Sequence, residues 1–111
     1  MLDKNSIIAA QDFKYKDIEV AEWGGSVRLR GLSSKDRDEY ESSIGITQDM
    51  SNMRARLVVR SLVDKEGERI FLDNDADALG EKNAETIARL FDEVRDLSGM
   101  SDEALGIAEG N

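Results

Sequence analysis

The chain has 111 residues, a formal net charge of −9 at pH 7, and no cysteine, histidine or proline. This length suits a single domain, and the missing residue types exclude disulfides, thiolate metal sites and catalysis by cysteine or histidine. Residues 71–111 hold eleven acidic and three basic side chains, so we expect neither nucleic acid nor a membrane as a partner. No apolar run is long enough for a signal peptide or a transmembrane helix, so we expect a soluble protein.

Residues 13–32 predict an antiparallel β-hairpin or small sheet. In VRLRGL, at 27–32, apolar residues and arginines alternate, as on a strand with one buried face. Gly24 and Gly25 accept the positive φ of a tight hairpin turn. Trp23 is expected to cover one sheet face, and stacking on a ligand is the less favoured interpretation. Residues 1–12 lack periodicity, and we expect them to be flexible apart from a helical turn.

A polar surface helix is expected over residues 34–44. Ser33 and Asp36 have the spacing of a capping box at its start. Gly45 is placed to end it, because glycine readily adopts the backbone conformations found after a helix.

A more apolar helix is expected over residues 50–64. Arg54, Arg56 and Arg60 lie beside its apolar stripe, and Arg56 and Arg60 share a face because they are four residues apart. The three arginines suit an acidic partner or RNA, but in so acidic a chain we favour pairing with its own carboxylates. The apolar stripe comprises Met50, Met53, Leu57, Val58, Leu62 and Val63, and the candidate caps are Thr47, Asp49 and Ser51.

Residues 73–80 look like a calcium-binding loop at first sight. Such a loop needs glycine at its sixth position and glutamate at its twelfth, but Ala78 and Ala84 stand there. We therefore interpret the stretch as a helix start capped by Asp73 or Asn74 and followed by Gly80 as the end of a short helix.

Residues 83–98 predict the clearest amphipathic helix, with Asn83 as its cap and Gly99 just after its end. We expect it to pack against the 50–64 helix and to be followed by a short acidic helix over 101–108 and a tail to 111. The expected fold is α+β, with residues 13–100 forming one domain in which the hairpin packs on three to four helices. The apolar stripe comprises Ile87, Leu90, Phe91, Val94 and Leu97.

No arrangement of residues predicts catalysis. Gly24 and Gly25 lack the third glycine and the Lys-Ser/Thr pair of a phosphate-binding loop. The serines have no histidine and no Ser-x-x-Lys spacing to activate them, and 24 acidic residues make neighbouring carboxylates inevitable. We expect a binding module with no enzymatic activity, no cofactor and no metal.

Four stretches form a pattern when they are taken in order. They are AEWGGSVRLRGLS at 21–33, KDRDEYE at 35–41, RLVVRSLVDKEGERIF at 56–71 and DADALGEKNAETIARLFDEVRDLSGM at 75–100. Each motif is common, but their order resembles the small tail assembly chaperones of long-tailed bacteriophages and prophages. The resemblance covers most of the chain.

The resemblance implies a protein that binds the phage tape measure protein in the cytoplasm of the bacterial host. It would keep that long helical protein soluble until the tail tube assembles, and it would be absent from the mature virion. In many phages a ribosomal frameshift adds a C-terminal extension that recruits the major tail protein. The oligomeric state stays open, with a homo-oligomer as one option.

As a hypothesis, the partner-binding surface comprises Met50, Met53, Arg54, Arg56 and Arg60, because methionine adapts to varied partners and arginine supplies charged anchors. Two alternatives remain at this point. The first is a small regulatory or nucleic-acid-binding domain, and the second is a structural tail component of the virion.

Overall fold

The structure is a computed structural model that describes residues 1–45 and 48–100. Three antiparallel strands form a sheet in the order β1-β2-β3. The first two make the hairpin that the sequence predicts, with Tyr15 opposite Arg30. The third pairs with β2 through Leu62 opposite Leu29. The strands are β1, Tyr15–Val20, β2, Gly25–Arg30, and β3, Leu62–Val63.

The hairpin turn differs from the expected two-residue turn. Val20 pairs with Gly25, so four residues connect the strands, three of them in a short 3-10 helix, η1, Ala21–Trp23. Gly24 has φ +81° and its amide donates to the carbonyl of Ala21 at 3.0 Å. Only one glycine of the pair therefore takes the left-handed conformation, while the other already belongs to β2. Trp23 packs against the core from this turn.

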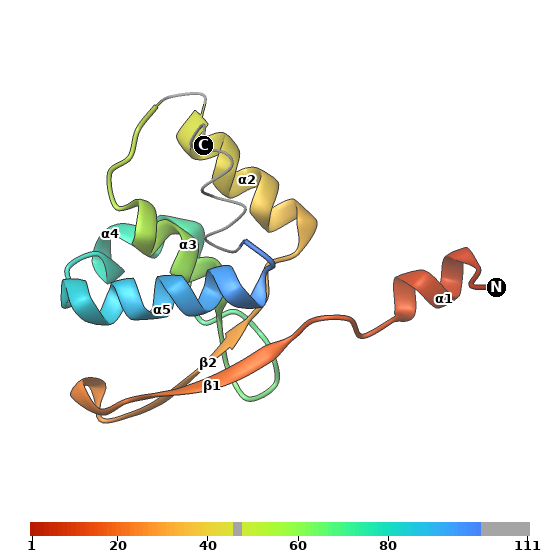
Figure 1. Cartoon of the computed structure of the whole chain (residues 1–111), viewed down its shortest axis with the longest axis horizontal. Helices are drawn as coiled ribbons and strands as arrows, with labels where there is room; N and C mark the ends of the chain where they lie inside the picture. The colour runs from red at the N-terminus through yellow and green to blue at the C-terminus, as the bar shows by residue number, and fades with distance from the viewer. Residues whose placement is uncertain (46–47, 101–111) are drawn as a thin grey trace.

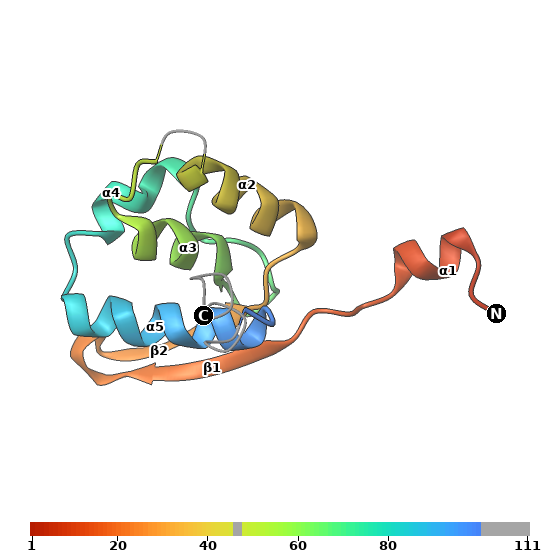
Figure 2. The same cartoon turned by 45° about the horizontal axis from the view of Figure 1, so that its top comes forward.

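The helices stack on one side of the hairpin. In Figure 2 the β1–β2 hairpin runs along the bottom, α5 lies on it, and α3 lies above α5 with α2 and α4 at the top. The predicted packing between α3 and α5 is confirmed, since they share the most extensive contact between any two helices described. The helices are α1, Lys4–Ala9, α2, Ser34–Gly45, α3, Met53–Ser61, α4, Ala76–Leu79, and α5, Ala84–Leu97.

The core lies between the sheet, α3 and α5. Leu29 from the sheet, Leu57 from α3 and Leu90 from α5 have no exposed surface. Leu62, which we expected in a helix, is 1% exposed at the start of β3. The apolar sides of three elements thus close on one another, which is the main stabilising term in a domain of this size.

The predicted 50–64 helix is shorter at both ends. It begins at Met53 after Asn52, which has φ +51° and makes no capping bond with its side chain. Asp49 does not cap the helix, because its carboxylate accepts hydrogen bonds from the Ser51 amide and hydroxyl. At the other end Leu62 turns to an extended conformation with ψ 121° and begins β3. Thr47 lies outside the described residues.

Three predicted helix ends are confirmed. Ser33 and Asp36 form the capping pair, with the Asp36 amide 3.0 Å from the Ser33 hydroxyl. The Asn83 carboxamide accepts from the amides of residues 85 and 86. After α5, Gly99 has φ +73°, and the Met100 amide donates to the Arg95 carbonyl at 2.7 Å. This is the Schellman arrangement, in which a left-handed glycine lets the next amide satisfy a free helix carbonyl.

The acidic stretch before α4 does not start a helix with Asp73 or Asn74 as cap. Asp73–Asp75 forms a 3-10 helix, η2, that is preceded by Leu72. The Leu72 amide donates to the Asp75 carboxylate at 2.8 Å, and Gly80 follows the short helix α4 as predicted. Within residues 1–45 and 48–100, no group of three or more acidic side chains is arranged to hold a metal ion.

At the N-terminus, α1 is capped by Asp3 and stands clear of the rest of the molecule (Figure 1). The expected helix over 101–108 lies outside the described residues. None of the helices described has the length and apolar character that a bilayer crossing requires.

Candidate protein-binding groove

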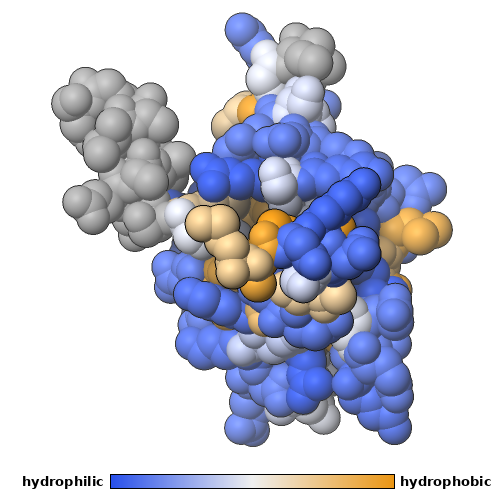
Figure 3. Space-filling model, turned by 90° about the vertical axis from the view of Figure 1, so that its right-hand side faces the viewer, coloured by the Kyte–Doolittle hydropathy of each residue, from blue (hydrophilic) through white to orange (hydrophobic). Residues whose placement is uncertain are grey.

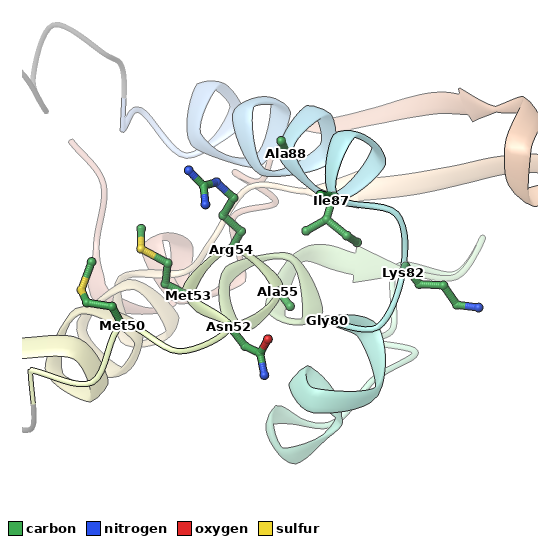
Figure 4. A pocket seen from close by; sticks show the side chains of 10 residues that line it. Met50, Asn52, Met53, Arg54, Ala55, Gly80, Lys82, Ile87 and Ala88 are labelled. Atoms are coloured by element: carbon green, nitrogen blue, oxygen red, sulfur yellow. The ribbon is translucent and has the colours of Figure 1, made fainter.

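A groove of about 430 Å³ lies between the N-terminal ends of α3 and α5. We call it the α3–α5 groove. Figure 4 shows Met53, Arg54 and Ala55 on one side and Ile87 and Ala88 on the other. Met50 and Asn52, before α3, and Gly80 and Lys82, between α4 and α5, complete the wall together with Ala84.

The floor of the groove is fixed by contacts between distant segments. The Asn52 carboxamide donates to the Asp77 carboxylate at 2.8 Å, which ties the start of α3 to α4. A Cβ at Gly80 would lie 2.5 Å from the Asn52 side-chain oxygen, so only glycine fits there without a shift. These two contacts hold the α4–α5 connection against the first turn of α3.

The apolar part of the groove combines a rigid wall with an adaptable one. Ile87 is 5% exposed and belongs to the core. Met50 is 54% exposed and Met53 is half-buried. Since methionine has a flexible, unbranched side chain that fills irregular space, this side can adjust to different apolar partners.

The charged part of the groove is positive. Arg54 is exposed, and its guanidinium carbon lies 5.7 Å from the centroid of the Phe91 ring. Within the described part of the chain, Arg54 and Lys82 form no salt bridge. Both cations are therefore available to a carboxylate from a bound segment.

Arg56 and Arg60 do not reach this groove. Arg56 donates to the Ser43 hydroxyl at 3.2 Å and to the carbonyl of Asp49, so it ties α3 to the end of α2. The side chain of Arg60 is 10% exposed and bonds to three carboxylates. They are Asp36 at 3.0 Å, Glu39 at 3.0 Å and Asp73 at 3.1 Å. The prediction that these arginines pair with the chain's own carboxylates is confirmed for Arg60. It is wrong for Arg56, which donates to a hydroxyl and to carbonyls, and for Arg54, which forms no salt bridge among the described residues.

The structure thus brings together three of the five predicted surface residues. Met50, Met53 and Arg54 line the groove, whereas Arg56 and Arg60 face α2. Sequence reasoning missed Lys82 as a lining residue and placed Ile87 only in the core. The one available signal was the pair of methionines at the start of a stripe that otherwise holds leucine and valine.

Two carboxylates have a lowered pKa: Asp49, which precedes Met50 in the chain, and Glu22, which is bonded to Thr86. Hydrogen bonds from Ser51 lower the pKa of Asp49. The Thr86 hydroxyl donates to Glu22 at 2.6 Å, and this bond, with help from Arg89, lowers the pKa of Glu22 to about 2. Both groups stay ionised at neutral pH because hydrogen bonds favour their charged form.

Comparison with known proteins agrees with this architecture. The sequence model of a family described as phage tail assembly chaperone matches residues 4–106. The solved structure of the bacteriophage HK97 tail assembly chaperone is similar with a TM-score of 0.64 and 21% identity, over 84% of this chain and 90% of that chain. At this identity the likeness shows a shared fold, and it confirms the predicted α+β class. No curated protein matched the sequence.

Proposed function

The chain belongs to the phage tail assembly chaperone family, and we propose that it binds the tape measure protein through the α3–α5 groove. Binding would involve no catalytic step and would keep the partner soluble while the tail tube assembles. The observation that carries this proposal is the groove itself, where adaptable methionines meet two cations that have no carboxylate partner among the described residues.

The groove favours one kind of ligand. An amphipathic helix lays its apolar side into such a groove through residues three and four apart. Arg54 and Lys82, on opposite sides of the groove, would then pair with acidic residues that flank the apolar stripe. A tape measure protein, expected to be long and helical, presents many segments of this kind. The adaptable methionine side suits a partner whose segments differ in sequence.

Arg56 and Arg60 take no part in this surface as we propose it. The Arg60 side chain is 10% exposed and surrounded by three carboxylates of its own chain, so a partner would have to break those ion pairs to reach it. Removing a buried charge from its partners costs more than a surface contact returns.

We also propose that the protein acts in the cytoplasm of the bacterial host and is left out of the mature virion. A longer form made by frameshifting would recruit the major tail protein. Mass spectrometry of purified phage particles tests whether the protein is left out of the mature virion. Peptides from this chain at the abundance of a structural tail protein would contradict it.

Co-expression with the tape measure protein tests the groove. The double variant Met50→Asp with Arg54→Glu places negative charge on both parts of the groove. Ile70→Asp is the matched control, because Ile70 is 52% exposed against 54% for Met50 and lines a different depression. We expect a soluble partner with the wild type and the control. With the groove variant we expect an insoluble partner and an affinity at least about tenfold lower.

Two outcomes would count against the proposal in different ways. A tape measure protein that is as insoluble with the wild type as without it would contradict the function. The binding surface would lie elsewhere if the groove variant kept the tape measure protein fully soluble, or if only the control variant failed to do so.

A further inference from the structure

The end of α5 holds the following chain on the side of the helix that carries Phe91. After the reversal at Gly99, the Met100 amide donates to the Arg95 carbonyl at 2.7 Å, and the Met100 carbonyl accepts from the Arg95 guanidinium at 3.2 Å. The Arg95 guanidinium carbon in turn lies 5.4 Å from the centroid of the Phe91 ring. The chain therefore leaves the helix next to this ring.

Arg54 approaches the same ring from α3. Its guanidinium carbon lies 5.7 Å from the centroid of the Phe91 ring, and Figure 4 shows its side chain extending from α3 towards α5. Together with Met53, these side chains form a surface that we call the Phe91 strip. It connects the end of α5 to the α3–α5 groove, since Met53 and Arg54 also line that groove. The strip comprises Met53, Arg54, Phe91 and Arg95.

The segment of residues 101–109 has the chemistry that complements this strip. It carries three carboxylates and no basic side chain. A helix over 101–108, as the sequence predicts, would gather the apolar side chains of the segment on one side, with carboxylates along the edges. The apolar residues are Ala104, Leu105, Ile107 and Ala108, and the acidic residues are Asp102, Glu103 and Glu109.

The surface beyond the end of α5 suits this segment less well. In Figure 1, α5 ends on the side of the molecule from which α1 projects. Figure 3 looks at that side, where hydrophilic side chains predominate around a central apolar cluster. A segment that continued in the direction of α5 would leave its apolar side chains mostly in water. A path back along α5 brings them to Phe91 and Met53.

The distance back along α5 is short enough for the segment to cover. Phe91 lies six residues before Leu97, the last residue of α5, or about 9 Å at a rise of 1.5 Å per residue. A helix over 101–108 would be about 12 Å long, and residues 101–109 span up to about 30 Å when fully extended. The segment can therefore reach the strip and the groove of its own chain.

We propose that residues 101–109 fold back onto the Phe91 strip and block the α3–α5 groove of their own chain. Leu105 and Ile107 would cover Phe91 and Met53. The carboxylates of the segment would pair with Arg54, which forms no salt bridge within the described part of the chain.

The docked segment would act as an intramolecular competitor of the tape measure protein, a role that rests on the proposed function. Only the fraction of molecules with an open groove can bind, so the apparent Kd rises as that fraction falls. A groove that is blocked about nine-tenths of the time would raise the apparent Kd about tenfold. High salt should shift the balance towards the open groove, because it screens the charges of the segment and of Arg54.

Disulfide trapping tests where the segment lies without any partner. The chain has no cysteine of its own, so a pair of introduced cysteines reports one contact. The test variant is Met53→Cys with Ala104→Cys. The matched control is Ile70→Cys with Ala104→Cys, because Ile70 is 52% exposed and lines a different depression. Under mild oxidation of dilute protein, we expect the intramolecular disulfide to form at least about tenfold faster in the test variant than in the control.

Addition of Arg54→Glu to the Met53 pair separates docking from random encounter. Glutamate would repel the acidic segment, so the rate of disulfide formation should fall to that of the control. Three outcomes would overturn the proposal: equal rates for the Met53 and Ile70 pairs, a rate that Arg54→Glu leaves unchanged, or a disulfide that joins two chains.

The affinity for the tape measure protein tests the competition. The variant Glu103→Lys with Glu109→Lys should release the segment from the groove and lower the Kd about tenfold. The matched control is Glu66→Lys with Glu68→Lys, which changes the net charge equally on the exposed turn after β3. We expect it to bind with the wild-type Kd to within about twofold. The proposal is wrong if the segment variant binds no tighter than this control.

The two readouts separate this proposal from the proposed function. A fast Met53 disulfide, with no binding of the tape measure protein by any variant, would keep the docked segment and reject the function. Binding of the tape measure protein with the same Kd for the wild type and the segment variant, together with a slow Met53 disulfide, would keep the function and reject the docked segment.

Discussion

Replacement of Arg60 by alanine should destabilise the fold without weakening partner binding. Arg60 is the centre of an ion-pair cluster that joins α3 to α2 and to η2. Its guanidinium contacts Asp36, Glu39 and Asp73 at distances of 3.0 to 3.1 Å. Alanine would remove all three ion pairs at once. The negative charge of Asp36 would then have less positive charge near it.

The magnitude follows from the burial of each pair. In the Asp36 pair the side chains of Arg60 and Asp36 are 10% and 15% exposed, and breaking a buried pair costs about 3–5 kcal/mol. Arg30 still contacts Asp36 at 3.3 Å, which reduces the loss. The side chains of Glu39 and Asp73 are half-exposed and would be solvated without Arg60, so the loss of each of these ion pairs costs about 0–1 kcal/mol. We expect a loss of about 2–3 kcal/mol, or a fall in Tm of about 10 °C.

Urea denaturation at pH 7 measures this loss, and double-mutant cycles divide it. The coupling between Arg60 and Asp36 should exceed that between Arg60 and Glu39 by about 1 kcal/mol, because only the first pair is shielded from water. A total loss under about 0.5 kcal/mol, the level of an ordinary surface substitution, would refute the assignment of Arg60 to the interior. Equal coupling energies for the Asp36 and Glu39 pairs would refute it as well.

Two further predictions concern pH and packing. The pKa of Glu22 is about 2 in the folded chain against an ordinary value of 4.5, so its contribution is present above pH 4.5 and is lost as pH falls towards 2. Glu22→Gln should therefore be less stable than the wild type at pH 7, with a difference in unfolding free energy that shrinks from pH 4.5 to pH 2; a constant difference would contradict the role of the Thr86 bond. Gly31→Ala should lose about 1–3 kcal/mol in denaturation, because a Cβ would lie 2.8 Å from the Leu97 carbonyl oxygen. Gly45→Ala, with open space around that position, is its control and should change stability by about 1 kcal/mol or less; equal losses would contradict the packing argument.

Local signals predicted the helices well because they act within a few residues. Asn83 caps α5 by accepting from amides two and three residues ahead. Because these residues are close in the sequence, the cap can be predicted without knowledge of the fold. The Gly99 ending is local in the same way. The apolar stripe of α5 has the helical period and needs no knowledge of its neighbours to be recognised.

The third strand could not be predicted on such grounds. Leu62–Val63 is short, apolar and fully buried, so its pattern is the same as that of the last turn of a buried helix. What makes it a strand is its pairing with residues 28 and 29 of β2. That partner lies more than thirty residues away, and no local signal reports it.

Only the α3 side of the groove could be predicted from the sequence, because the other side is brought there by contacts between distant segments. Met50, Met53 and Arg54 come from one stretch of chain, so sequence reasoning grouped them. Lys82 and Ile87 reach the groove through the packing of α5 on α3 and the Asn52–Asp77 bond. Helical period grouped Arg60 with Arg56, but it did not show that α2 and η2 would enclose Arg60.

The arrangement of arginines gives the strongest reason to regard the groove as a binding surface. The chain has 24 acidic and 15 basic side chains, so a folded arginine finds a carboxylate easily. Throughout the described residues, every arginine except Arg54 donates to a carboxylate or a carbonyl. Arg54 instead lies over the Phe91 ring, next to Met50 and Met53 in the groove. The proposed function gives this exposed arginine a role, because its guanidinium would pair with a carboxylate of the bound segment.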